Sequence, residues 1–191
     1  MDMSTHLDRS KYEIKPVTQS TALDLVTRYH YAKGGSNTGT FRHGLFKISD
    51  GENPLGVAWW IPPTKSAALS VSDDWRTVLC LTRLVVIPGM PTNSASFLLG
   101  ASIKAIRRDG RFKTLVTYAD EGQGHSGAIY RATNWTYAGV RPGDPVYLTE
   151  SGRQVARKAG GVTRTNAQML GLGYTNTGRT RKHKFVMRLE K

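Results

Sequence analysis

Three side chains that can bind a metal or move a proton lie in one short segment, YADEGQGHSGAIY, at positions 118–130. Asp120 closes a run typical of a β-strand, His125 follows it, and Tyr130 ends the segment. Glycines between them let the backbone turn sharply and approach a ligand, and active-site groups favour the carboxyl ends of strands in α/β proteins. The segment therefore predicts the rim of a catalytic site. The alternative is a glycine-rich turn in which Asp120 caps a helix and Tyr130 belongs to the core.

A second candidate pair, His30 and Tyr31, follows a predicted helix. The imidazole could act as a base or a metal ligand, and the tyrosine offers a phenol. A histidine near the C-terminus of a helix is often only a partner of the helix dipole. The pair gains meaning if the fold brings Tyr31 beside Asp120. His30 and Asp120 could then hold a metal, although the HExxH and paired CxxC spacings of common metal sites are absent.

The charge of the chain indicates a polyanionic partner. Its 27 Lys and Arg outnumber its 14 Asp and Glu, which leaves a net charge of +13. Such an excess favours nucleic acid, with a solvated basic surface as the alternative. The segment RTRKHKF near the C-terminus is a natural phosphate contact, or else an edge strand protected by lysine. The residues predicted to bind nucleic acid are Arg179, Arg181, Lys182 and Lys184.

An enzyme that acts on a base in duplex DNA must extrude that base and hold it against aromatic side chains. The chain has four tryptophans, at positions 59, 60, 75 and 135. Most tryptophans in a domain of this size lie in the core. Trp60, shortly before Pro62, is the one predicted to be exposed.

The length of 191 residues suits one domain with a substantial core, so we expect a single domain over 1–191. The lone Cys80 excludes an internal disulfide and favours a reducing compartment. No apolar run approaches the ~18 residues that cross a bilayer, and the first residues do not resemble a signal peptide. We therefore expect no membrane partner. The oligomeric state is open, with a homodimer as one option.

Hydrophobic periodicity predicts the elements that position these residues. Positions 11–17 favour a first strand, and apolar residues at helical spacing predict a helix over 22–31, capped by Ser20 or Thr21. Positions 40–48 and 55–61 indicate a hairpin. Positions 77–87 are nearly all apolar, which is typical of a central strand covered on both faces. A helix over 94–110, ended by Gly110, and a strand over 112–120 follow.

The remainder of the chain is predicted to hold a short helix over 126–135, a strand over 136–140, a basic, loop-rich excursion at about 141–181 and a last strand over 182–189. The order β-α-β-β-β-α-β-α-β, followed by that last strand, predicts an α/β fold. It has a mixed central sheet with helices on both faces. This order is close to that of the GNAT acyltransferase fold, an analogy of architecture that proves no activity.

The junction after Ile87 would hold a cofactor in such a fold, because the exposed amides at a helix N-terminus bind pyrophosphate. The usual Arg/Gln-x-x-Gly-x-Gly/Ala signature of coenzyme A sites is absent, and helix capping alone would also explain the polar residues there. The residues predicted to bind a cofactor are Val85, Val86, Asn93, Ser94 and Ser96.

Four motifs together resemble the phage Mom family, whose members modify adenine in phage DNA. The motif from Tyr118 to Gly139, YADEGQGHSGAIYRATNWTYAG, is long and specific. Three shorter motifs appear in the family's order: YHY at 29–31, LTRLVV at 81–86 and KHKFV at 182–186. Together the four motifs span most of the chain.

The resemblance implies a GNAT-like fold and transfer of a carbamoylmethyl group to N6 of adenine in double-stranded DNA, which masks the DNA from host restriction enzymes. It implies an active centre of His30, Tyr31, Asp120 and Tyr130, with iron as a proposed metal and acetyl-CoA or another acyl donor as the candidate cofactor. The protein would then act in the cytoplasm of the infected bacterial host. Two alternatives stay open: an acyltransferase for an amine on a protein or small molecule, and a DNA-binding protein without enzymatic activity.

Overall fold

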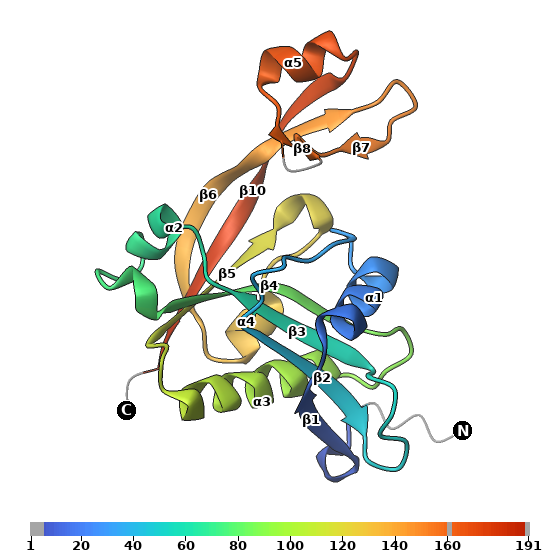
Figure 1. Cartoon of the computed structure of the whole chain (residues 1–191), viewed down its shortest axis with the longest axis vertical. Helices are drawn as coiled ribbons and strands as arrows, with labels where there is room; N and C mark the ends of the chain where they lie inside the picture. The colour runs from blue at the N-terminus through green and yellow to red at the C-terminus, as the bar shows by residue number, and fades with distance from the viewer. Residues whose placement is uncertain (1–5, 160–161, 190–191) are drawn as a thin grey trace.

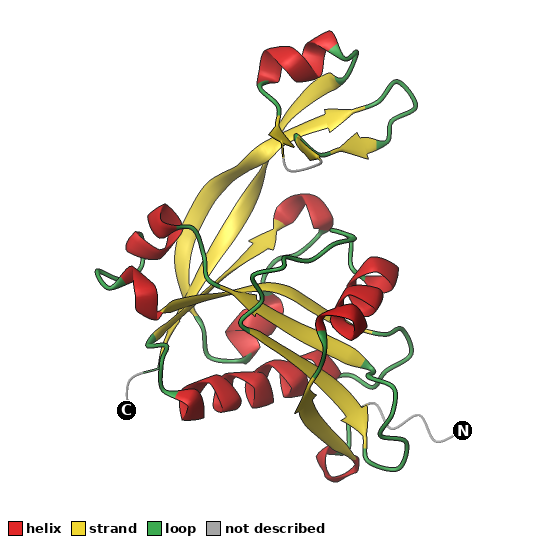
Figure 2. Cartoon of the chain, in the orientation of Figure 1, coloured by secondary structure: helices red, strands yellow, loops and turns green. Residues whose placement is uncertain are grey.

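The computed structural model describes residues 6–159 and 162–189, in which helices pack on both faces of a mixed sheet (Figures 1 and 2). The sheet has eight strands in the order β1-β2-β3-β4-β5-β10-β6-β7, and β8 and β9 form a separate pair. The strands are β1 (Tyr12–Pro16), β2 (Phe41–Lys47), β3 (Gly56–Ile61), β4 (Val78–Val86), β5 (Thr114–Asp120), β6 (Thr136–Leu148), β7 (Gln154–Val155), β8 (Lys158–Ala159), β9 (Val162–Thr163) and β10 (Thr175–Arg188). The α-helices are α1 (Gln19–Tyr29), α2 (Lys65–Leu69), α3 (Ser94–Asp109), α4 (Ala128–Ala132) and α5 (Asn166–Gly171), with 3-10 turns η1 (Arg9–Lys11), η2 (Trp75–Thr77) and η3 (Glu121–Gln123).

The pairing of β4 with β5 is the one parallel pairing in the described sheets, and it is short. Partners run only from Val78 opposite Thr114 to Leu81 opposite Thr117. On its other side β4 pairs with β3, where a register shift between Trp59 and Trp60 marks a bulge. A bulge bends its strand and increases the local twist. The second half of β4 therefore leaves β5 and opens a gap in the middle of the sheet.

Two apolar layers cover the opposite faces of this sheet. Strand β3 shows the division, since side chains alternate between faces along a strand. Ala58 and Trp60 pack with residues of α3, whereas Val57 and Trp59 pack with residues of α1. A third, smaller cluster includes Ala68 of α2. The predicted mixed sheet with helices on both faces is thus confirmed, as is a strand β4 covered on both faces.

Three local predictions need correction. Helix α1 begins earlier than its apolar spacing indicated, because the Thr18 side chain accepts a hydrogen bond from the Thr21 amide and acts as the cap. Trp60, predicted to be exposed, is fully buried, and its indole Nε1 donates to Ser102 Oγ at 2.7 Å. The excursion at 141–181 is largely regular structure, since β6 and β10 run far into it.

Within the described residues, the search for a helix long and apolar enough to cross a membrane found none.

Candidate active site

A cavity of about 350 Å³ opens where β4 and β5 diverge, and we call it the central cavity. Residues from both faces of the sheet reach it, because α1 and α4 pack on opposite faces. The end of α1 contributes His30 and Tyr31, and the start of α4 contributes Tyr130. The rest of the lining comes from 81–84 of β4, Ala95, 117–119 of β5 and 124–129. Three of the four predicted catalytic residues therefore share one cavity.

His30 caps the C-terminus of α1 and is 9% exposed. Its Nδ1 accepts a hydrogen bond from the Ala32 amide at 3.0 Å, so a neutral ring carries its proton on Nε2. Burial first, and then the positive charge of Arg83, lower the pKa of His30 to about 4. The imidazole is therefore neutral near pH 7. With its proton on Nε2, this cavity-lining ring offers a hydrogen-bond donor, and the role of base stays a prediction.

This depressed pKa gives the folded protein a defined pH dependence. The unfolded chain binds a proton at His30 below about pH 6.5, whereas the folded chain does so only near pH 4. The free energy of unfolding should therefore fall as the pH drops through this window, by about 2 kcal/mol between pH 7 and pH 5. Urea unfolding of the wild type and of His30→Asn, which keeps an acceptor for Ala32, will measure the difference. Parallel pH profiles for the two proteins would contradict the assignment.

The tyrosines of the cavity lie among aromatic neighbours. The Tyr31 ring stacks on His30 with centroids 4.4 Å apart and meets the edge of His125 at 5.6 Å. Tyr130 packs against Trp135 and Phe185 at 5.7 and 5.2 Å. Burial raises the pKa of the Tyr130 phenol, and burial followed by the charge of Asp120 raises that of Tyr31. Both phenols therefore keep their protons near neutral pH and can donate hydrogen bonds.

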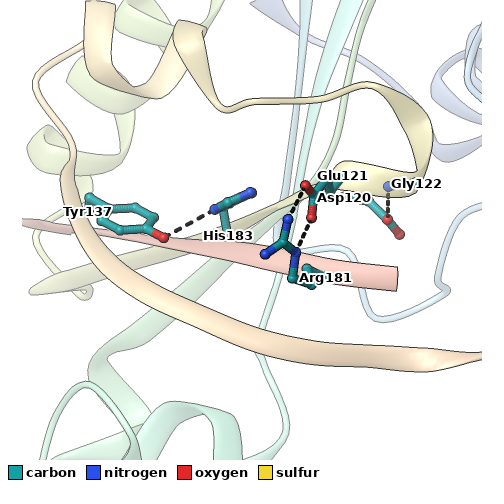
Figure 3. Close-up of polar contacts among 6 residues, drawn as sticks. All are labelled: Asp120, Glu121, Gly122, Tyr137, Arg181 and His183. Carbon is teal, nitrogen blue, oxygen red and sulfur yellow. Dashed lines mark hydrogen bonds and ion pairs between the residues drawn. The ribbon is translucent and has the colours of Figure 1, made fainter. Parts of the chain in front are cut away.

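Asp120 lies at the rim rather than in the lining of the central cavity. It ends β5, and its Oδ1 accepts a hydrogen bond from the Gly122 amide at 3.0 Å, which caps η3 (Figure 3). The carboxylate lines a neighbouring hollow on the other side of this turn. Asp120 is nevertheless close enough to the cavity to affect Tyr31 electrostatically. Asp120 thus acts as a cap, as the interpretation of this segment as a glycine-rich turn required. Its second carboxylate oxygen has no protein partner among the described residues.

Arg83 is a cavity residue that was not predicted as a site residue. Its Nε donates to the Gly34 carbonyl and one Nη to the Thr82 carbonyl, both at 2.7 Å. No carboxylate of the described residues forms an ion pair with it, and burial lowers its pKa. A guanidinium left unpaired in this way favours an anionic or carbonyl-bearing ligand. The signal in the sequence was a single charge inside the otherwise apolar run LTRLVV.

Cys80 lies near this cavity and is not a reactive thiol. Burial raises its pKa to about 12, so its thiolate is scarce at neutral pH. A covalent intermediate on this sulfur is therefore not part of the chemistry that the site supports.

The predicted cofactor residues divide into two groups. Val85 and Val86 line a hollow of about 340 Å³ that shares His30 and Tyr31 with the central cavity. The hydroxyls predicted to donate to a cofactor are instead used locally, since Ser94 donates to Pro91 and Ser96 to Asn93. Asn93 precedes α3 with φ 76° and makes no side-chain cap. What the junction does present is the backbone beyond Ser94, because amides in the first turn of a helix lack helical partners and the Ser94 amide already donates to the Pro91 carbonyl. The fit to an anionic cofactor therefore rests on these amides.

A metal does not fit the described residues as they stand. His30 uses Nδ1 to accept from Ala32 and holds a proton on Nε2, and Asp120 keeps only one free carboxylate oxygen, because Oδ1 accepts from Gly122. No group of three or more His, Cys, Asp or Glu gathers in metal-binding geometry among the residues that the structure describes. The iron implied by the resemblance thus lacks a preformed ligand set here, and no step is derived through it.

The four predicted nucleic-acid contacts lie on β10, and all have partners within the protein. Arg181 forms a two-pronged ion pair, whereas Arg179 bonds only to a backbone carbonyl and keeps its charge uncompensated. Contact with phosphate stays a prediction for each of them. The partners are Gly143 for Arg179, Glu121 for Arg181, Asp144 for Lys182 and Ser70 for Lys184.

Comparison with known sequences identifies the protein family to which the chain is similar. The model of the Mom protein family matches residues 11–191. A curated relative, the methylcarbamoylase Mom of Escherichia phage Mu, is 26% identical over 122 residues, which is 62% of this chain and 49% of the relative. The aligned part thus spans about half the length of that relative.

Solved structures share the fold. NAA60 of Arabidopsis thaliana in complex with acetyl-CoA has a TM-score of 0.59 at 9% identity, covering 93% of this chain and 99% of that one. The ribosomal-protein-S18-alanine N-acetyltransferase of Escherichia coli has a TM-score of 0.56 at 12% identity, covering 94% and 95%. These likenesses show a GNAT acetyltransferase fold.

Proposed function

Because this chain belongs to the Mom protein family, we propose that it is a DNA-modifying transferase that adds a carbamoylmethyl-type group to N6 of adenine in phage DNA. The modification would protect that DNA from restriction in the cytoplasm of the infected bacterium. The observation that carries the proposal is the cavity at the divergence of β4 and β5, where His30, Tyr31 and Tyr130 meet beside Asp120. The name of the phage Mu relative supports the type of group transferred.

The cavity suits a base taken out of the duplex. The N6 amine is engaged in pairing within DNA, so the nucleotide must be extruded before it reacts. Tyr31 is 46% exposed at the cavity and forms an aromatic wall with His125, against which an adenine can stack. The volume of about 350 Å³ admits a base together with a small transferred group.

The polar groups divide into hydrogen-bond donors and a carboxylate. The Nε2 proton of His30, the Tyr130 phenol and the Arg83 guanidinium can donate to a carbonyl oxygen as negative charge develops on it. Asp120 is the carboxylate at the rim, and its free oxygen can accept a hydrogen bond, and then a proton, from the N6 amine. The arrangement supports attack by an amine on an electrophilic carbon, assisted by a carboxylate.

An acyl-CoA is the donor that this fold favours, since solved neighbours carry acetyl-CoA. The first-turn amides of α3 would hold its pyrophosphate, and the gap between β4 and β5 would hold the flexible chain that ends in the thioester. When bound, it would supply an acyl carbon, with the CoA thiolate as the leaving group when the amine attacks. A thioester alone would give an N6-acyl group, so the N–CH2 bond and the amide nitrogen of a carbamoylmethyl group require a second reactant.

The test is direct. We expect that expression of the protein beside a plasmid, digestion of the plasmid to nucleosides and mass spectrometry will reveal a deoxyadenosine that is heavier by one carbamoylmethyl group. An ordinary N-acyltransferase would bind CoA tightly and leave all nucleosides unmodified. A DNA-binding protein without activity would retain DNA and leave them unmodified as well. Either result would refute the proposal.

A further inference from the structure

Residues 141–159 and 162–181 form a projection that we call the arm: the distal part of β6, then β7, β8, β9 and α5, and the first half of β10. Strand β10 pairs with β5 only from Lys182 onward, so before that residue it pairs with β6 alone. Figure 1 shows the arm leaving the sheet, with α5 and β7 at its far end. Among its described residues, the arm contributes no side chain to the central cavity.

The tip of the arm has a small core of its own. Isolated two-stranded ribbons are at best marginally stable in water, so a ribbon of this length needs support. Tyr147 and Met169 are fully buried there, and the Tyr147 hydroxyl donates to Asn166 at 2.6 Å. Thr165 and Gln168 form a reciprocal capping box that fixes the start of α5. The arm is therefore an ordered element rather than an open loop.

The base of the arm is fastened to the turn that carries Asp120. Arg181 donates to both oxygens of Glu121, at 2.6 and 2.7 Å, and the Tyr137 hydroxyl lies 3.1 Å from His183 Nδ1 (Figure 3). Lys182 is the register partner of Asp120 across β5 and β10. Through these contacts the direction of the arm is set relative to the rim of the central cavity.

The arm is strongly basic. It holds seven Lys and Arg against two acids, Asp144 and Glu150, so its net charge is 7 − 2 = +5. No ion pair with a carboxylate is found in the described part of the chain for Arg153, Arg164 or Arg179. Arg153 and Arg179 are exposed and Arg164 is half-buried. These three cations are available to an external anion.

A hollow of about 520 Å³, the arm hollow, lies between the arm and η3. Arg157 and Lys182 supply positive charge to its wall, and Gln123 and Gln154 supply amides. Asp120 and Asp144 line it as well, and Lys182 pairs with Asp144, so Arg157 is the cation of the wall without a carboxylate partner among the described residues. Only the Asp120 turn separates this hollow from the central cavity, since Gly122 and Gln123 line one and Gly124 lines the other. A strand bound in the arm hollow would thus lie beside the catalytic rim.

We propose that the arm is the element that docks duplex DNA: Arg153, Arg164 and Arg179 contact phosphates along the duplex, and the arm hollow takes the backbone next to the target nucleotide. That nucleotide swings past η3 into the central cavity. Positive charge without counter-ions along an ordered ribbon matches a regular row of phosphates, and a two-stranded ribbon has dimensions that a DNA groove admits. The identity of the target base rests on the proposed function, whereas docking of DNA does not.

The test compares two triple variants with equal loss of charge. One is Arg153→Gln/Arg164→Gln/Arg179→Gln on the arm. The other is Lys104→Gln/Arg107→Gln/Arg108→Gln, which removes three exposed cations from α3. Binding to a short duplex is measured by fluorescence anisotropy between about 50 and 200 mM salt. Melting curves of both variants check that they are folded, and the single variant Arg153→Gln serves if the arm triple variant is not.

We expect the arm variant to reduce the slope of log affinity against log salt by about 2 to 3, since each phosphate contact contributes about 0.9. Its affinity should fall at least about tenfold, while the α3 variant stays close to wild type. Equal slopes in the two variants would overturn the inference. Wild type that binds DNA through the arm but leaves adenine unmodified would refute the proposed function alone. Full modification of limiting DNA by the arm variant would refute the proposed role of the arm in docking DNA and leave the proposed function standing.

Discussion

Asp120→Ala is expected to abolish DNA modification while leaving DNA affinity within about twofold of wild type. The carboxylate oxygen that is free of Gly122 is a proton acceptor at the cavity rim, and general acid–base groups contribute about 10² to 10⁴ in rate. Loss of this carboxylate removes a negative charge beside Lys182, which cannot weaken attraction to phosphate. Nucleoside mass spectrometry and duplex-binding titration measure the two effects on the same preparation.

The matched variant Asp120→Asn separates chemistry from capping. Asparagine keeps a side-chain oxygen that accepts from the Gly122 amide, so η3 retains its cap, which is typically worth about 1 kcal/mol. It lacks the charge and basicity of a carboxylate. If the carboxylate is catalytic, Asn and Ala will be equally inactive. If Asn retains the wild-type rate, Asp120 serves only as a cap and the assignment is wrong.

The regular elements of the fold were predictable because each buries one continuous apolar face. The spacing of Ala22, Leu25 and Val26 gives α1, and all three are buried in the structure. The apolar run that becomes β4 gives a strand covered on both sides. Such patterns are local, so they reveal the elements and their order, from which the mixed sheet follows. The start of α1 was misplaced because three neighbouring hydroxyl residues compete as caps, and only Thr18 accepts from the helix.

The arm and the cavity lining were harder to predict, for reasons of environment. Both faces of the ribbon at Thr175–Arg179 are exposed to water, so no apolar alternation marks it as a strand. Trp60 lies close to a proline, yet its side chain packs against α3. Side chains alternate between the two faces of a strand, so the position of Trp60 within β3 decides which face it occupies. Arg83 enters the cavity through the bulge opposite Trp59, and a bulge depends on pairing between strands rather than on local sequence. His30 and Tyr130 were candidates by residue type and by the resemblance to the Mom family, and the structure places both at the central cavity, while their catalytic role stays a prediction.

Gly127→Ala is expected to destabilise the protein by roughly 2 to 5 kcal/mol, the sum of backbone strain and overpacking. Gly127 has φ 77°, which favours glycine, and a Cβ there would overlap the ring of the fully buried Phe185. That ring cannot yield, because Tyr130 and Tyr137 pack against it. Chemical denaturation of the variant and of the wild type measures the loss.

Gly124→Ala is the control for this prediction, since Gly124 has a similar φ of 70° but open space where the Cβ would stand. It should lose only the strain, about 1 to 2 kcal/mol. Because the Gly127 carbonyl accepts the Tyr130 amide at the start of α4, displacement of Gly127 also moves a wall of the central cavity. We therefore expect Gly127→Ala to lose modification under conditions in which Gly124→Ala keeps it. Equal losses of stability in the two variants would show that Phe185 can move aside to make room for the added Cβ, and the expected overpacking would then be wrong.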